Sequence, residues 1–362
     1  MANEPVTPPE ILETKRASPV QIFVRAALTL VLLYLVFGVL IPGFAPYSEI
    51  WDSIQRLDMR AVLFLTALTL LAEVMKSLGP VVLLERLSPP RSFLAQETSA
   101  TVSYTVPGPS GTAMRYVTYR RYGLSAEDFG RSTVTNGLWT NLVALILPTL
   151  AIGLLALQDE VPRHVLWLTL IALGAAVSGI VIAVLILRSE RFARGFGMRL
   201  GRLVTWARGV VRRPRPQDYA DMVVRFRLDL GDSARRHWRG LSGAILGKEF
   251  TLYVILLVSL RAVGTGRISL TAIEIFAVYA VVRVATMVQI TPGGVGVTET
   301  LYISALLLAS DGEAEEAIVG GVFVFRMFTY LGPILLGLVC WPILGRVLRR
   351  GTGRPGGITS SG

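Results

Sequence analysis

The ionisable side chains inside otherwise apolar segments of the sequence include Glu73, Lys76, Arg283 and Arg326. A charged group in such a segment is expensive to bury, and the default hypothesis for it is a functional one. Glu73 and Lys76 are three residues apart, which places them on one face of a helix and allows them to pair. Two interpretations stay open for this pair: a structural contact, or a contribution to substrate binding by coupling or charge compensation.

Arg326 lies deep in an apolar segment, and its guanidinium has the planar fork that binds phosphate or carboxylate through two hydrogen bonds. We expect either a role along a transport pathway or an interhelical ion pair with Glu73 or Glu274. Asn141 lies 185 residues before Arg326 (326 − 141 = 185), so both positions offer a strong hydrogen-bond donor.

The same offset of 185 residues relates two Pro-Gly-x-x-Gly motifs. The first motif is Pro107-Gly108-Pro109-Ser110-Gly111, and the second motif is Pro292-Gly293-Gly294-Val295-Gly296. Broken backbone at membrane depth survives only where protein or a water-filled cavity satisfies its polar groups. Interrupted apolar segments at matching positions of two halves therefore predict a transport site. The offset also pairs Lys76 with Arg261, Thr101 with Thr286, and Pro148 with Pro333, which indicates an internal duplication.

The two motifs also predict the charge of the ligand. Glycine lets a ligand approach the backbone, and free N–H groups at a helix N-terminus favour anions. Gly111 and Gly296 would each precede such a helix. Glu299 would lie in the first turn of the second helix, either as a capping group or as a binding group for a ligand that also carries an amine.

The substrate-binding candidates are the residues at the two motifs and the charged residues near them. They are Pro107, Gly108, Gly111, Arg115, Arg283, Pro292, Gly293, Gly294, Gly296, Glu299 and Arg326, with Glu73, Lys76 and Asn141 as candidates for coupling or charge compensation.

Several kinds of chemistry lack the residues they require. His164 and His237 are the only histidines, they lie in separate loops, and Cys340 is the only cysteine, so the sequence predicts neither a metal site nor a disulfide. Gly247-Lys248-Glu249 lacks the flanking residues of a phosphate-binding P-loop. We therefore expect no cofactor and no enzymatic activity.

The composition predicts an all-α polytopic membrane protein with six to eight transmembrane helices. Of the 362 residues, 52% are hydrophobic and only 17% are charged. Apolar runs that approach the length of a membrane span lie at about 21–42, 61–84, 132–157, 164–187, 241–263 and 317–345. Shorter apolar pieces flank the two motifs at about 92–106, 112–122, 269–290 and 297–310.

The arginine distribution predicts the topology. Residues 188–240 hold fourteen arginines against five acids, and by the positive-inside rule they belong in the cytoplasm. The N-terminus 1–20 is then cytoplasmic as well. The tail 346–362 is also cytoplasmic and is predicted to be disordered. The net charge of +11 lies mostly in loops beside membrane spans. We therefore attribute it to the orientation of the protein in the membrane and to binding of anionic lipid, rather than to binding of nucleic acid. Within the basic loop, 191–211 is predicted to be an amphipathic interfacial helix.

This topology makes the two halves inverted relative to each other. The repeat units are about 61–157 and 241–345, inside a transmembrane domain that covers 21–345. Each Pro-Gly motif would form the tip of a re-entrant helical hairpin, and the two tips would meet near the midplane. Residues 269–290 are long enough to cross the membrane, so eight complete crossings are the alternative.

The sequence resembles the flippase-like family that includes the transmembrane region of lysylphosphatidylglycerol synthases. The resemblance covers about 60–345 and is carried by Gln289-Ile-Thr-Pro-Gly-Gly-Val-Gly-Val-Thr-Glu299 and Phe325-Arg-Met-Phe-Thr-Tyr-Leu-Gly-Pro333. Val106-Pro-Gly-Pro-Ser-Gly-Thr-Ala-Met-Arg115 resembles the family's first motif. The family implies translocation of lipid across the bilayer. The resemblance does not extend to the aminoacyl-transferase domain of the synthases, so synthase activity is not expected.

The predicted function is translocation of a phosphate-bearing lipid head group across a bacterial plasma membrane. Two alternatives stay open: a secondary transporter for a small anionic solute, and a non-catalytic membrane partner of a cell-envelope glycosyltransferase. The expected partners are the lipid substrate and anionic lipid at the basic loop 188–240. A homo-oligomer or a partner from cell-envelope biosynthesis would be compatible with the sequence.

Overall fold

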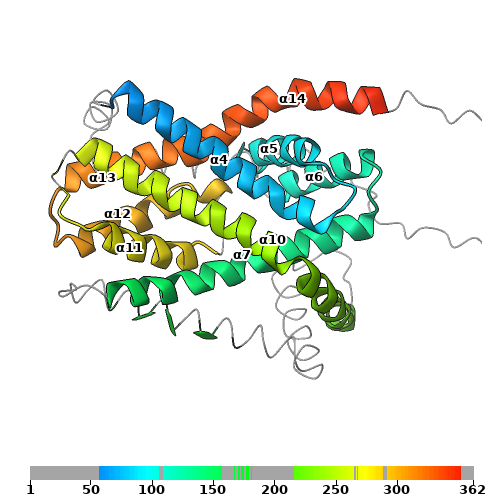
Figure 1. The fold of residues 1–362 in the computed structure, drawn as a ribbon, viewed down its shortest axis with the longest axis horizontal. Helices are drawn as coiled ribbons and strands as arrows, with labels where there is room; N and C mark the ends of the chain where they lie inside the picture. The colour runs from blue at the N-terminus through cyan, green and yellow to red at the C-terminus, as the bar shows by residue number, and fades with distance from the viewer. Residues whose placement is uncertain are drawn as a thin grey trace, which may run out of the picture. The chain divides into compact units, whose positions relative to one another are not determined.

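The computed structural model describes residues 57–105, 109–156, 216–264, 266, 268–287 and 292–351, together with single residues between 167 and 181. All of these belong to one compact unit. The secondary structure across these ranges is helical, with no strand (Figure 1). The elements are α4 (Met59–Leu83), α5 (Pro89–Thr105), α6 (Ser110–Arg121), α7 (Ala126–Leu155), α10 (Pro216–Gly264), α11 (Ala272–Ala285), η2 (Pro292–Gly294), α12 (Val297–Ala309), α13 (Glu315–Arg326), η3 (Met327–Leu331) and α14 (Gly332–Gly351).

Four long apolar helical segments have the length and hydropathy of membrane spans. They are Met59–Leu83, Ala126–Leu155, Arg236–Gly264 and Glu315–Val347, and they confirm the predicted spans at 61–84, 132–157, 241–263 and 317–345. At most 39% of each apolar window is buried inside the protein. Large apolar side chains such as Phe250 and Val339 are instead about two-thirds exposed, at 65% and 64%. Such outward-facing apolar surface is what a lipid environment requires.

Two predicted spans cannot be compared with the structure in the same way. The segment 21–42 lies outside the described residues, and in 164–187 only single helical residues are described. The predicted amphipathic helix 191–211 also lies outside the described residues.

Hydrogen bonds at the first turn fix where two of the helices begin. The Ser125 hydroxyl accepts from the Asp128 N–H at 2.9 Å, and α7 therefore begins at Ala126, six residues before the predicted position. Thr271 and Glu274 form the same reciprocal cap at the start of α11, where the Glu274 carboxylate accepts from the Thr271 N–H at 2.7 Å. Glu274 is therefore a capping residue.

A pair of short helices surrounds each Pro-Gly motif. Helices α5 and α6 contact each other, and so do α11 and α12. These four helices confirm helical structure in the apolar pieces predicted around the motifs. Helix α11 has 14 residues. At 1.5 Å per residue it extends about 21 Å, well short of the ~30 Å hydrocarbon core.

The last span is interrupted, which the sequence analysis did not predict. Helix α13 ends at Arg326, a π-helical turn covers Met327–Leu331, and α14 follows. Pro333 lies two residues after the end of this turn and has no N–H to donate to the carbonyl of Thr329, so the regular hydrogen-bond ladder cannot continue there.

Two further predicted boundaries differ from those of the structure. Helix α14 continues to Gly351, so the first six residues of the predicted disordered tail 346–362 are helical. Helix α10 begins at Pro216, so the second half of the predicted loop 188–240 is a helix that continues into the membrane span.

The helix pairs pack across the two halves of the sequence. Helix α4 packs against α10, α5 packs against α14, and α11 packs against α7 (Figure 1). At the α5–α14 contact a Cβ added to Gly337 would lie 2.3 Å from the carbonyl oxygen of Glu97, so only glycine permits this approach. Each motif-containing pair is therefore held by the last helix of the other half.

Candidate functional site

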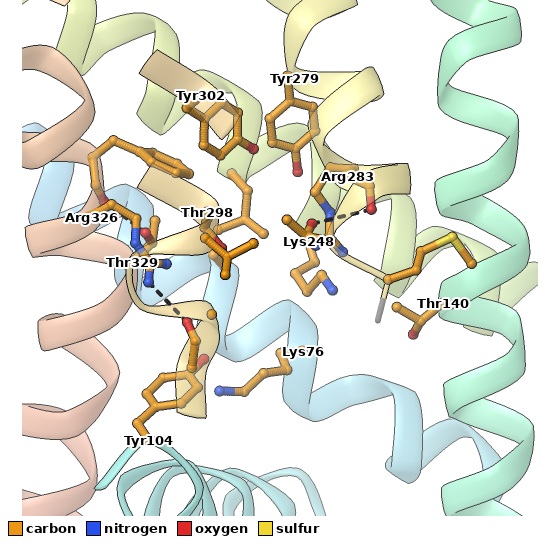
Figure 2. A pocket seen from close by; sticks show the side chains of 18 of the residues that line it. Lys76, Tyr104, Thr140, Lys248, Tyr279, Arg283, Thr298, Tyr302, Arg326 and Thr329 are labelled. Carbon is orange, nitrogen blue, oxygen red and sulfur yellow. Dashed lines mark hydrogen bonds between the residues drawn. The ribbon is translucent and has the colours of Figure 1, made fainter. Parts of the chain in front are cut away.

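A cavity of about 330 Å³ lies where both halves of the chain meet. Four basic side chains reach it, each from a different helix: Lys76 from α4, Lys248 from α10, Arg283 from α11 and Arg326 from α13 (Figure 2). The other lining residues are Ala72, Glu73, Tyr104, Thr140, Asn141, Leu252, Tyr279, Thr286, Met287, Gly293, Gly294, Val297, Thr298, Tyr302, Phe325 and Thr329. The cavity is thus polar and rich in cations, inside a bundle whose outer surface is apolar.

Two of the cations share the buried carboxylate of Glu249. Arg283 donates to both carboxylate oxygens, from Nε at 2.7 Å and from a terminal nitrogen at 2.8 Å. Lys248 Nζ lies 2.8 Å from Oε1, and the Tyr279 hydroxyl donates to Oε2 at 2.7 Å. The carboxylate is therefore fully solvated by protein donors. Because two cations surround one anion, this cluster carries one net positive charge.

Arg326 pairs with Glu299, which corrects the predicted interhelical partners Glu73 and Glu274. Its Nε donates to Glu299 Oε1 at 2.7 Å, and a terminal nitrogen donates to the Gly293 carbonyl at 2.9 Å. Its guanidinium also lies over the Tyr330 ring, 5.2 Å from the centroid. The actual partner lies on α12 because Glu274 is held by its own helix cap and Glu73 contacts Lys76.

Glu299 confirms its predicted capping role and joins the second motif to α13. Its Oε2 accepts from the Gly296 N–H at 2.7 Å while its Oε1 binds Arg326. The motif itself needs glycine, because Gly293, Gly294 and Gly296 have φ angles of 61°, 70° and 83°. At Gly293 a Cβ would also lie 2.4 Å from the Tyr330 ring. Because these positions have no Cβ, the backbone of η2 can form this turn at the edge of the cavity.

Lys76 lies between two carboxylates, one predicted and one missed. It contacts Glu73, which confirms the predicted pair, and its Nζ lies 3.0 Å from Glu97 Oε1. Glu97 is completely buried, at 0% exposure. Its signal in the sequence was the same one that identified Glu73, namely an ionisable residue inside an apolar piece, here 92–106.

The first motif is described only in part. Pro107 and Gly108 lie outside the described residues. Gly111 is buried against α5, where a Cβ would lie 2.5 Å from the Ser99 carbonyl oxygen. Arg115 donates to Gln96 Oε1 at 2.8 Å and is not among the residues that line the cavity.

The remaining predicted residues are placed as follows. Pro292 begins η2. Asn141 and Arg326 both line the cavity.

Sequence reasoning missed Lys248, Glu249 and three tyrosines of the cavity. Lys248-Glu249 lies inside the predicted span 241–263, so the cost of burying charge could have identified both residues. The tyrosines, Tyr104, Tyr279 and Tyr302, have no such signal, because tyrosine is common in apolar helices. Tyr104 stacks on Tyr330 at 5.2 Å between ring centroids and receives a hydrogen bond at its carbonyl from the Tyr330 hydroxyl, which ties α5 to η3.

Comparison with known proteins agrees with the resemblance found in the sequence. The family described as the lysylphosphatidylglycerol synthase TM region matches residues 22–337, which is most of the chain. No curated protein matches the chain. The match includes the first three apolar spans, most of the fourth span (Glu315–Val347), both helix pairs and every residue of the cavity. The chain is therefore a multi-pass membrane protein that belongs to the lysylphosphatidylglycerol synthase TM-region family.

Proposed function

We propose that this protein is a lipid transporter that moves a phosphate-bearing head group across the plasma membrane. The observation that carries the proposal is that four basic side chains converge on one cavity. The backbone of Gly293 and Gly294, which have no side chain to cover it, lines the same cavity. Phosphate is recognised by guanidinium and ammonium groups and by free backbone N–H groups. The cluster of Glu249, Lys248 and Arg283 has one net positive charge to offer such an anion.

The helix packing supports an inverted repeat with two re-entrant hairpins. In this proposal α5–α6 enters from the cytoplasm and α11–α12 from outside, with both termini of the chain in the cytoplasm. The short length of α11 favours a hairpin over a complete crossing. The exchange of partners, α5 with α14 and α11 with α7, is the packing expected of two units related by a pseudo-two-fold axis.

The apolar exterior supports a lipid as the substrate rather than a solute. Acyl chains would stay in the bilayer, next to exposed apolar side chains on the spans, while the head group occupies the cavity. Membership of a family described by a lipid-modifying synthase points to the same class of substrate. The site is proposed to bind and release its substrate without chemical change.

Reconstitution tests this function directly. Purified protein is placed in phosphatidylcholine liposomes with acyl-labelled phosphatidylglycerol, and the lipid that moves between leaflets is counted by chemical quenching of the outer leaflet. We expect transbilayer movement well above that of protein-free liposomes. Movement equal to the protein-free rate for phosphatidylglycerol, phosphatidylethanolamine and phosphatidic acid would refute the lipid proposal.

A second arm distinguishes a solute transporter. The same liposomes are loaded with buffer and offered radiolabelled inorganic phosphate. We expect no uptake, because the head group is proposed to reach the cavity from the bilayer. Phosphate uptake without lipid movement would assign the cavity to a small anion instead.

A further inference from the structure

We propose that Glu73, Lys76 and Glu97 form a proton-binding site, and that one proton binds as the anionic head group enters the cavity. This inference rests on the proposed function and concerns how that transport is driven. The cluster places one ammonium between two carboxylates: Lys76 contacts Glu73 and lies 3.0 Å from Glu97. With both carboxylates ionised the cluster has one net negative charge inside the protein.

Glu97 has fewer hydrogen-bond donors than Glu249, another buried carboxylate beside the cavity. Apart from its ion pair with Lys76, neither of its oxygens accepts a hydrogen bond from the described part of the chain. Glu249, which is equally buried, has donors from Lys248, Arg283 and Tyr279. A carboxylate without donors is costly to bury, and a bound proton removes that cost.

The charges around the cavity balance before any ligand enters. Four basic side chains face four carboxylates, which are Glu73, Glu97, Glu249 and Glu299. A phosphate that pairs with the net positive cluster of Glu249 would leave the net negative cluster of Glu73, Lys76 and Glu97 without compensation, and unpaired charge in a low-dielectric site is strongly unfavourable. A proton taken up with the phosphate restores the balance.

Lys76 is the side chain that can link the two events. It lines the cavity and extends towards Tyr104 (Figure 2), and its side chain is 27% exposed whereas that of Glu97 is 0% exposed. A phosphate in the cavity attracts the Lys76 ammonium, which leaves two neighbouring carboxylates with less positive charge. One carboxylate oxygen then binds a proton from water and forms one O–H bond. The pair titrates as a unit, so the proton belongs to both glutamates.

Other charged or titratable groups lie near this cluster on the neighbouring helices, and one of them, Arg115, has a positive charge that its neutral partner does not cancel but lies outside the cavity lining. Arg115 of α6 is bonded to Gln96, and Lys248 of α10 is bonded to Glu249. Cys340 of α14 faces Glu97. On α5 itself, Tyr104 also lies within electrostatic range of Glu97.

Infrared spectroscopy detects the proton directly, without transport. A protonated carboxylic acid has a carbonyl-stretch band that carboxylates lack. We expect this band in protein in phosphatidylcholine nanodiscs at neutral pH to grow when phosphatidylglycerol is added. Glu97→Gln and Glu73→Gln should each abolish the growth. Glu85→Gln, which changes an exposed glutamate after α4 outside the cavity, is the control and should leave the growth intact. No band growth in the wild type, or growth that survives both cluster variants, would overturn the inference.

Transport under a pH gradient gives the second readout. In the liposome assay, acid on the side of the labelled phosphatidylglycerol should speed its movement by up to about tenfold per pH unit, since one proton is coupled. Glu97→Gln should lose this dependence, whereas Glu85→Gln, an exposed glutamate after α4, should keep it. Movement that responds to a sodium gradient and not to pH would overturn proton coupling.

The two proposals fail in different ways. If no lipid moves under any gradient, the proposed transport fails, and the infrared band still decides whether lipid binding brings a proton to the cluster. If lipid moves equally with and without a pH gradient, and Glu97→Gln behaves like the wild type, the transport proposal stands and proton coupling is refuted.

Discussion

At the scale of single residues, Arg326 combines two tasks that substitution can separate. It neutralises Glu299 and holds the Gly293 carbonyl, and it faces the cavity. The sequence identified Arg326 as a candidate because buried charge is expensive, but it could not identify Glu299 as the partner. Pairing depends on how α12 and α13 lie side by side, and a single sequence carries no information about that distance.

Arg326→Gln should nearly abolish lipid transport, and Arg326→Lys should reduce it strongly. Lysine keeps the charge but cannot bond Glu299 and the Gly293 carbonyl through one planar group. Loss of the charge leaves Glu299 unpaired, which costs about 3–5 kcal/mol in a buried pair. Thermal unfolding in detergent and liposome transport measure the two effects.

The double variant Arg326→Gln with Glu299→Gln is the control for pairing. It removes both charges, so we expect much of the lost stability to return while transport stays low. Recovery of transport along with stability would mean that Arg326 only balances Glu299 and does not contact the substrate.

The glycines of the second motif offer a further test at this scale. Gly294→Ala should abolish transport, because Gly294 has a φ of 70° and a Cβ would lie 2.5 Å from the Thr298 hydroxyl at the cavity wall. Gly123→Ala is the matched control: its φ is 85°, but no atom lies within 4 Å of the added Cβ. Both variants carry the left-handed strain of about 1–2 kcal/mol, so equal loss of transport would assign the effect to folding.

At the scale of elements, the sequence predicted the helices well and their interruptions poorly. Long apolar runs and the cost of open backbone in lipid leave few alternatives to helices, so the four spans were confirmed within a few residues. The π-helical turn at Met327–Leu331 was missed because proline is tolerated in membrane helices in several geometries. Pro148 lies at the corresponding position of the first half, yet α7 is continuous.

The contact between α5 and α14 predicts a local cost of added volume. Gly337→Ala should destabilise the protein by about 1–3 kcal/mol, as overpacking does. The reason is that a Cβ would lie 1.9 Å from the Thr101 hydroxyl oxygen and 2.3 Å from the Glu97 carbonyl oxygen. Gly345→Ala, in the same helix with no atom within 4 Å, should be neutral or slightly stabilising. Equal unfolding temperatures for the two variants would contradict this packing.

At the scale of the whole molecule, composition was sufficient to predict a multi-pass membrane protein, and the 185-residue offset directed attention to both motifs. The offset also paired Asn141 with Arg326, and both line one cavity. Composition and spacing could not reveal that the cavity balances four cations against four carboxylates, because the ion pairs join different helices: Lys76 of α4 meets Glu97 of α5, and Arg283 of α11 meets Glu249 of α10. That balance arises only from the packing of the two halves together.

Inversion of the two halves predicts that equivalent turns lie on opposite sides of the membrane. Glu127 follows the turn after the first helix pair, and Glu313 lies in the turn after the second; both are exposed. In a Cys340→Ala background, Glu313→Cys should react with an impermeant thiol reagent in intact cells, because residues 311–316 hold four acids and no base and are expected on the outer side. Glu127→Cys should react only after the cells are permeabilised, as should Thr205→Cys in the basic loop. Labelling of Glu127→Cys and Glu313→Cys from the same side would mean that the halves are parallel, and alternating access by inverted hairpins would then have no structural basis.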